Sequence, residues 1–143
     1  MKICIINGPN LNLLGKREPE IYGSVDFDEF ISSLKEKYPK VELSYFQSNI
    51  EGELINRLQD AGFKGDGIIL NPGGYTHTSV AIGDCIAAIP APVIEVHISN
   101  IFAREEFRKH SFVSAKAKAV ISGMGLLGYE AAINYLLNGK VEL

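Results

Sequence analysis

The sequence predicts a doubly wound α/β fold, in which helices cover both faces of a five-stranded parallel sheet. Short apolar runs rich in β-branched residues alternate along the chain with segments of helical period. The first of these runs is apolar at nearly every position, which is typical of a parallel strand buried on both faces, whereas in the second Val41, Leu43 and Tyr45 alternate with polar residues. A chain of 143 residues is long enough for one such core, so we predict a single domain over residues 1–143.

Each predicted strand ends where turn-forming or polar residues begin. The first strand stops at Gly8-Pro9 and the third at Asn71-Pro72, because glycine and proline interrupt regular structure. The predicted strands cover residues 2–6, 41–45, 67–70, 92–98 and 117–121.

The helical segments lie between these strands. Asp26 is a good helix cap, and apolar residues recur after it with helical period until Pro39 stops the helix. A second helix has its apolar positions at 54–58, and we expect it to end at Gly62. The later segments are 79–89, 102–108 (a short helical turn) and 126–137.

Charge and composition exclude several kinds of partner. The 14 basic and 17 acidic residues give a net charge of −3, which provides no electrostatic attraction to nucleic acid. No apolar run approaches the ~20 residues of a membrane span, and the N-terminus lacks a signal-peptide pattern. Cys4 and Cys85 both lie in apolar surroundings, so we expect reduced core residues of a cytoplasmic protein.

The segments that directly follow the strands are where this fold binds ligands. They are rich in amides and hydroxyls and contain two of the three histidines. Such groups suit a neutral or anionic polyhydroxy molecule held by hydrogen bonds. Helix capping and turn formation are the alternative interpretation for any single Asn or Ser. The segments are 7–10, 47–49, 71–79 and 95–100, followed by Arg104 and Arg108.

His97 is the most informative single residue. Glu95, His97 and Ser99 share one face of a strand, because side chains repeat every two residues. A carboxylate beside an imidazole holds its tautomer and favours its charged form, which suits a general acid. A purely structural histidine is the alternative. His77 can bind a ligand or cap a helix, and we expect His110 to be solvated.

The loop over about residues 15–24 has glycines near both ends and a length that suits a lid over a strand-end pocket. It carries Arg17 and Tyr22. A phenol becomes a base near neutral pH only if cations lower its ordinary pKa of about 10, and Arg17 and Arg104 are candidates for this. In the alternative interpretation Tyr22 packs its ring and Arg17 is solvated.

One glycine motif resembles a dinucleotide fingerprint. The spacing Gly123-x-Gly125-x-x-Gly128 matches G-x-G-x-x-G, but the chain lacks the following strand with its acidic residue. We therefore interpret these glycines as a tight turn with close helix packing. His77 and His97 are not at a metal-pair spacing and have no further ligands nearby, so we expect no metal.

Five motifs, in order along nearly the whole chain, resemble the type II 3-dehydroquinate dehydratases. Four of them continue into neighbouring positions. REP at 17–19 and Tyr22-Gly23 follow the first, and Glu51-Gly52 follows the second. THTSVA at 76–81 follows the third, and Arg104-Glu105 and Phe107-Arg108 follow the fourth. The five are GPNLNLLG at 8–15, QSN at 47–49, NPGG at 71–74, EVHISN at 95–100 and GMGLLG at 123–128, with Tyr129 after it.

The resemblance implies a flavodoxin-like fold and the anti elimination of water from 3-dehydroquinate, through an enolate, to 3-dehydroshikimate in the shikimate pathway. It implies no organic cofactor and no metal. By this analogy Tyr22 removes the C2 proton, Arg17 stabilises the tyrosinate, and Asn10 helps to hold the enolate oxygen. His97, oriented by Glu95, protonates the departing hydroxyl.

The same resemblance implies the remaining contacts. Arg104 would lie against the tyrosine, and the backbone at Ile98 and Ser99 would take the carboxylate. The hydroxyls would be bound by Asn71, His77, Asp84 and Arg108. The family forms homododecamers, as tetramers of trimers. Gly83 and Gly74 depart mildly from the family pattern, outside the catalytic set.

Two other functions stay open from the residues alone. One is a flavodoxin-like module that binds a nucleotide, a flavin or a partner protein without catalysis, since fold does not determine function. The other is a Schiff-base dehydratase, which would need a buried lysine. No clear apolar pocket is expected at Lys2, Lys16, Lys64, Lys116 or Lys118.

Overall fold

The computed structural model describes residues 1–16, 20 and 25–139. Within them a five-stranded parallel sheet has the order β2-β1-β3-β4-β5. This is the strand order of the flavodoxin-like fold, so the predicted fold class is confirmed. The strands are β1 (Lys2–Asn7), β2 (Glu42–Gln47), β3 (Gly67–Asn71), β4 (Val93–His97) and β5 (Ala119–Ser122).

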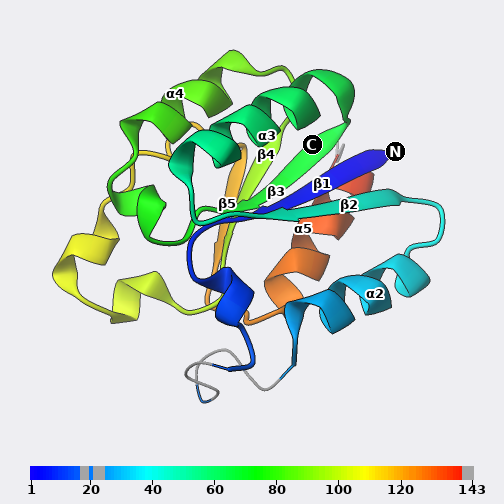
Figure 1. The fold of residues 1–143 in the computed structure, drawn as a ribbon, viewed down its shortest axis with the longest axis horizontal. Coiled ribbons are helices and arrows are strands. Elements are labelled where there is room, and N and C mark those ends of the chain that lie inside the picture. Colours follow the sequence, from blue (N-terminus) through cyan, green and yellow to red (C-terminus); the bar gives the residue numbers. More distant parts are fainter. Residues whose placement is uncertain (17–19, 21–24, 140–143) are drawn as a thin grey trace.

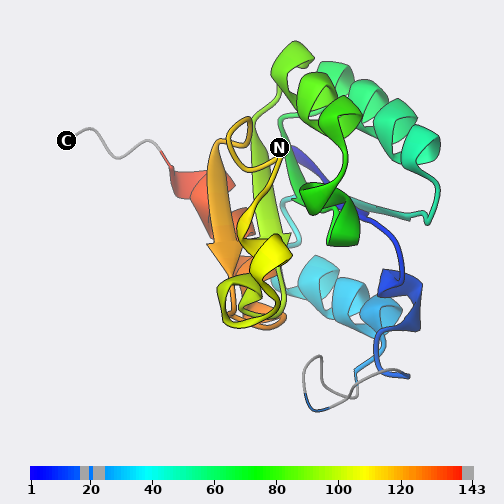
Figure 2. The same ribbon diagram turned by 90° about the vertical axis from the view of Figure 1, so that its left-hand side faces the viewer.

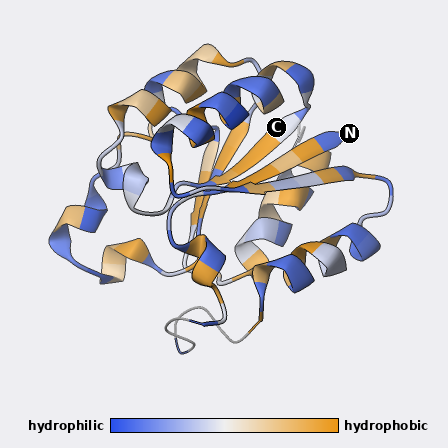
Figure 3. Ribbon diagram, viewed as in Figure 1, coloured by the Kyte–Doolittle hydropathy of each residue, from blue (hydrophilic) through white to orange (hydrophobic). Residues whose placement is uncertain are grey.

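Two pairs of helices enclose the sheet (Figure 1). Helices α2 (Phe27–Lys37) and α5 (Leu127–Asn138) cover one face, and α3 (Glu51–Lys64) and α4 (Val80–Ala88) cover the other. Side chains of β1 point alternately to the two faces of the sheet. Ile3 and Ile5 pack in the hydrophobic core on the face that α2 and α5 cover. The strands are accordingly apolar along most of their length (Figure 3).

Local sequence signals explain where two of these helices begin. The Asp26 carboxylate accepts a hydrogen bond from the Asp28 N–H at 2.8 Å, as expected for the predicted cap of α2. The Ser79 hydroxyl accepts from the Ile82 N–H at 3.0 Å and caps α4 in the same way.

The expected end of the second helix at Gly62 is wrong. Helix α3 continues to Lys64, and Gly65 follows it. A Cβ atom on Gly62 would lie 2.6 Å from the Ile89 side chain. The glycine therefore serves the close contact between α3 and the end of α4, and this packing outweighs its weak helix propensity.

The glycine motif after β5 is a turn with close packing, as predicted. Gly123 and Gly125 have φ values of +89° and +61°, a left-handed conformation that favours glycine. A Cβ atom on Gly128 would lie 3.1 Å from Val96 Cγ1, so this glycine brings α5 close to the sheet.

Four short 3-10 helices lie among the described residues. They belong to the segments that leave the carboxyl ends of β1, β3 and β4 (Figures 1 and 2). They are η1 (Leu11–Leu13), η2 (Gly73–His77), η3 (Ile101–Ala103) and η4 (Glu106–Lys109). The single helical turn expected over 102–108 is therefore two separate turns.

Two features predicted from the sequence concern the cysteines and the length of the helices. Cys4 and Cys85 are free and buried, as predicted. In the described part of the chain, no helix combines the length and the apolar character that crossing a membrane requires.

Candidate active site

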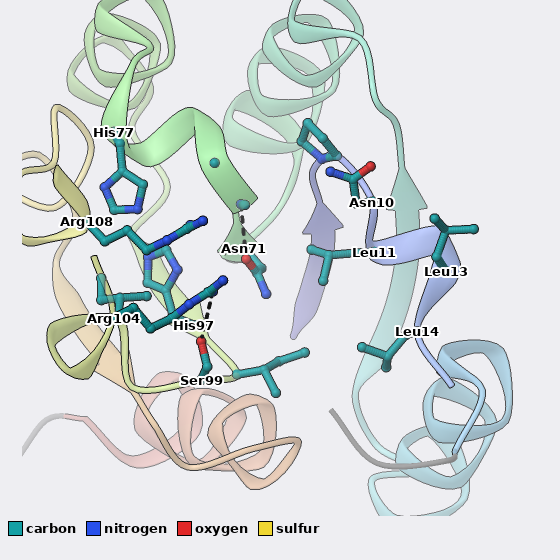
Figure 4. A pocket seen from close by; sticks show the side chains of 15 residues that line it. Asn10, Leu11, Leu13, Leu14, Asn71, His77, His97, Ser99, Arg104 and Arg108 are labelled. Carbon is teal, nitrogen blue, oxygen red and sulfur yellow. Dashed lines mark hydrogen bonds between the residues drawn. The ribbon is translucent and has the colours of Figure 1, made fainter. Parts of the chain in front are cut away.

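A pocket with a cavity volume of about 170 Å³ opens where β1, β3 and β4 end (Figure 4). One wall is apolar and comes from η1 and its neighbours, including Leu11, Leu13 and Leu14. The opposite wall is polar and comes from the ends of β3 and β4 and the segment after them. The predicted site residues that line it are Asn10, Asn71, His77, His97, Ile98, Ser99, Arg104 and Arg108.

Of the other predicted site residues, two that the structure describes do not line this pocket. Glu95 is completely buried and contacts His97. Asp84 is exposed on α4 and is not among the residues around the cavity. Arg17 and Tyr22, with most of the predicted lid at 15–24, lie outside the described residues.

The Glu95 carboxylate accepts three side-chain hydrogen bonds. His97 Nε2 lies 2.7 Å from Oε1, Thr76 Oγ1 donates to Oε1 at 2.5 Å, and Ser114 Oγ donates to Oε2 at 2.6 Å. Burial by itself would raise the pKa of Glu95, but these bonds and the charge of His97 outweigh burial and lower the pKa below its ordinary range. Glu95 is therefore an ionised acceptor that fixes the His97 ring.

The sequence analysis did not predict the hydroxyl groups that donate hydrogen bonds to Glu95. Thr76 and Ser114 are each 19 residues from Glu95 along the chain, and they reach it only through the fold. Ser111 extends the network with a hydroxyl 2.6 Å from Thr76 Oγ1. Thr76 lies inside one of the family motifs, but no local signal pointed to Ser111 or Ser114.

Two arginines make one side of the pocket positive. Arg104 Nη1 donates to Ser99 Oγ at 3.4 Å, and Arg108 Nε donates to Glu105 Oε2 at 2.6 Å. The Arg108 guanidinium also lies 4.9 Å from the centre of the Phe107 ring. These contacts hold the two cations in place, and guanidinium groups bind carboxylates well.

The turn after β1 places Asn10 at the cavity. Asn10 has φ = 71°, a left-handed conformation that asparagine tolerates better than most residues. Its N–H donates to Asn49 Oδ1 at 3.0 Å, and Gln47 Nε2 donates to the Gly8 carbonyl at 3.2 Å. The motif at 47–49 therefore supports this turn and does not line the pocket.

His77 is held by its neighbour in the segment after β4. Its Nδ1 lies 2.7 Å from the His110 carbonyl oxygen and therefore donates to it. The Nε2 atom then remains for a ligand. The His110 side chain itself is exposed, as predicted.

Comparison with known proteins connects this geometry to one family. The model of the family "Dehydroquinase class II" matches residues 1–137. The chain belongs to this family. The resemblance stated from the sequence motifs is thereby confirmed.

Individual relatives match over almost their entire length. The chain is 52% identical to a 3-dehydroquinate dehydratase of Fusobacterium nucleatum, covering 96% of this chain and 97% of that protein. It is 53% identical to catabolic 3-dehydroquinase 2 of Neosartorya fischeri, covering 93% and 90%. The crystal structure of type II dehydroquinase from Butyrivibrio crossotus superposes with a TM-score of 0.92 at 46% identity, covering 96% and 98%.

Proposed function

We propose that this protein is a 3-dehydroquinate dehydratase, a hydro-lyase that converts 3-dehydroquinate to 3-dehydroshikimate in the shikimate pathway. The observation that carries this conclusion is the buried Glu95–His97 pair at a pocket with two arginines, in a chain that matches the family over residues 1–137. The relatives do not favour the alternative of a flavodoxin-like binding module. Among the described residues no lysine lines the pocket, so nothing supports Schiff-base chemistry.

His97 acts as the general acid. Ionised Glu95 can only accept hydrogen bonds, so Nε2 carries the hydrogen of their contact. The proton delivered to the departing C1 hydroxyl therefore comes from Nδ1 of the imidazolium. Glu95 stabilises this charged form, so that His97 can give the departing hydroxide the proton it needs.

Tyr22 acts as the base that removes the C2 proton, with Arg17 and Arg104 stabilising its phenolate. The family motifs around residues 17–23 support the roles of Tyr22 and Arg17, and the position of Arg104 at the cavity supports its role. The enolate that forms develops charge on the ketone oxygen. Asn10, held at the cavity by its turn, helps to stabilise that oxygen. The proton and the hydroxyl leave from opposite faces, an anti elimination.

The remaining site residues bind substrate. The carboxylate of 3-dehydroquinate lies at the backbone of Ile98 and Ser99, and the hydroxyls are bound by Asn71, His77, Asp84 and Arg108. All of these except Asp84 line the cavity, which supports their assignment. For Asp84 the support is the sequence motif alone.

We also propose how the enzyme is organised. One catalytic domain spans residues 1–143, with a lid at about 15–24 and without metal or organic cofactor. The enzyme assembles as a homododecamer, a tetramer of trimers, in the cytoplasm. Exposed apolar side chains on and after the edge strand β5, at Val120, Met124 and Leu127, support association. The buried free cysteines support a reducing compartment.

The decisive experiment follows the enone absorbance of 3-dehydroshikimate after mixing protein with 3-dehydroquinate and a chelator. We expect turnover, a loss of about 10²–10⁴-fold in kcat for His97→Ala, and almost complete loss for Tyr22→Phe with substrate binding retained. A wild-type protein without turnover that is stabilised by FMN and not by dehydroquinate would show the function to be wrong.

A further inference from the structure

We propose that Tyr129 of α5 is a positioning residue for the pocket, because its buried hydroxyl fixes the Asn71 carboxamide with an N–H directed at the substrate. This role rests on the proposed function, since it takes 3-dehydroquinate as the molecule whose oxygen accepts from Asn71. The glycine motif at 123–128, with Tyr129 after it, has no part in the reaction steps proposed above, and this role would give Tyr129 one.

The hydrogen bonds around Asn71 fix the direction of its side chain. The Gly73 N–H can only donate, and it lies 3.1 Å from Asn71 Oδ1. The opposite end of the carboxamide is therefore Nδ2, which donates to the Tyr129 hydroxyl at 3.0 Å. The Tyr129 hydroxyl in turn donates to Asn7 Oδ1 at 2.9 Å. A flipped Asn71 would direct its NH₂ group at the Gly73 N–H and lose that bond, and its oxygen could accept from Tyr129 only if the hydroxyl gave up Asn7.

This arrangement limits what Asn71 offers to a ligand. Its oxygen already accepts from Gly73, and one of its two N–H bonds is directed at Tyr129. Asn71 lines the cavity (Figure 4), so its second N–H is the donor available there. A ligand oxygen that accepts a hydrogen bond is the matching group.

Tyr129 itself is held from three sides. Its side chain is completely buried, and its ring packs edge-on against Phe27 and Phe30, with centroids 5.0 and 5.9 Å away. Gly128 beside it lets α5 approach Val96 of β4. Burial raises the pKa of Tyr129 well above its ordinary value, so the hydroxyl keeps the proton that Asn7 accepts.

The first test replaces only the hydroxyl. In Tyr129→Phe we expect KM for 3-dehydroquinate to rise about tenfold, the size expected for one misplaced hydrogen bond, with a smaller change in kcat. The matched control is Tyr38→Phe, which also removes a hydroxyl that contacts α5, at Asn134 Oδ1 3.5 Å away. It should leave KM unchanged. Equal KM values for wild type and Tyr129→Phe would overturn the proposal.

A double-mutant cycle separates positioning from general loosening of the fold. If Tyr129 acts through Asn71, Tyr129→Phe should not raise KM further in an Asn71→Ala background. A further tenfold rise in that background would overturn the proposal. Absence of turnover in the wild type would instead contradict the proposed function.

A third test uses the wild-type protein and needs no turnover, so it applies even if Tyr129→Phe does not fold. In ¹⁵N NMR spectra of the ligand-free wild type, the Nδ2 hydrogen of Asn71 that is directed at the Tyr129 hydroxyl should exchange slowly with water. The side chain of exposed Asn12 is the internal control. Exchange at Asn71 as fast as at Asn12 would show that the carboxamide is not held and would overturn the proposal.

Discussion

At the scale of single residues, the site depends on buried polar groups whose partners are fixed. Glu95 is fully buried, yet three donors, one of them the His97 imidazole, keep it ionised. A buried carboxylate without such partners would take up a proton instead. The negative charge of Glu95, which stabilises the protonated ring of His97, therefore depends on the hydrogen bonds from Thr76 and Ser114.

This network makes stability depend on pH. The folded-state pKa of Glu95 is lowered, so the folded chain binds fewer protons than the unfolded chain near the ordinary glutamate pKa of about 4.3. The stabilisation is complete above that pH and is lost as pH falls through the folded-state value. Urea unfolding at several pH values should show a shallower acid loss for Glu95→Gln than for wild type. Parallel curves would contradict this.

The same substitution should slow catalysis. Glu95→Gln keeps the volume of the side chain but removes the charge that favours the imidazolium, so we expect kcat to fall about tenfold or more. Steady-state kinetics measures this, and circular dichroism checks that the variant is folded. Unchanged kcat in a folded Glu95→Gln would show that the carboxylate does not prepare the acid.

At the scale of elements, glycines determine how closely neighbouring segments approach. Gly62 lies inside α3, where the Ile89 side chain occupies the space of a Cβ atom. Gly52, in the first turn of the same helix, has nothing within 4 Å of that position. The two sites therefore separate helix propensity from packing within one element.

We expect Gly62→Ala to lower the free energy of unfolding by about 1–3 kcal/mol, because the new methyl group must displace Ile89. Gly52→Ala is the control and should be neutral or stabilising by up to ~1 kcal/mol. Urea unfolding measures both. A Gly62→Ala variant as stable as Gly52→Ala would show that α3 and α4 are not tightly packed there.

At the scale of the whole molecule, the pocket exists because parallel strands bring distant turns together. The Gly8 N–H donates to the Asn71 carbonyl at 2.7 Å and joins the turns after β1 and β3. A Cβ atom on Gly8 would lie 2.5 Å from the Pro72 carbonyl oxygen. Asn10 and Asn71 therefore keep their relative positions only while residue 8 has no side chain.

Gly8→Ala should accordingly reduce both stability and activity. The backbone of Pro72 cannot move without shifting Asn71 and Gly73, so we expect kcat/KM to fall about tenfold or more. Thermal unfolding and kinetics on the same preparation measure the two effects. Wild-type kcat/KM in Gly8→Ala would show that the two turns adjust independently.

Local signals predicted most of the fold, while long-range contacts escaped prediction. The cap at Asp26 and the apolar runs depend on neighbours in sequence, and they located the elements to within a few residues. The predicted helix end at Gly62 was wrong because glycine is favoured both at helix ends and where two helices pack closely. At the site, strand ends indicated the pocket residues, but the partners of Glu95 come from segments whose proximity only the fold creates.

The ionised carboxylate of Glu95 also determines which nitrogen of His97 is recharged after each turnover. Its two oxygens already receive hydrogens from the ring, Thr76 and Ser114. As an ionised group it carries no proton of its own to return to the imidazole. Because Nε2 stays bonded to Glu95, the nitrogen that must take up a new proton is Nδ1, the same atom that protonated the departing hydroxyl.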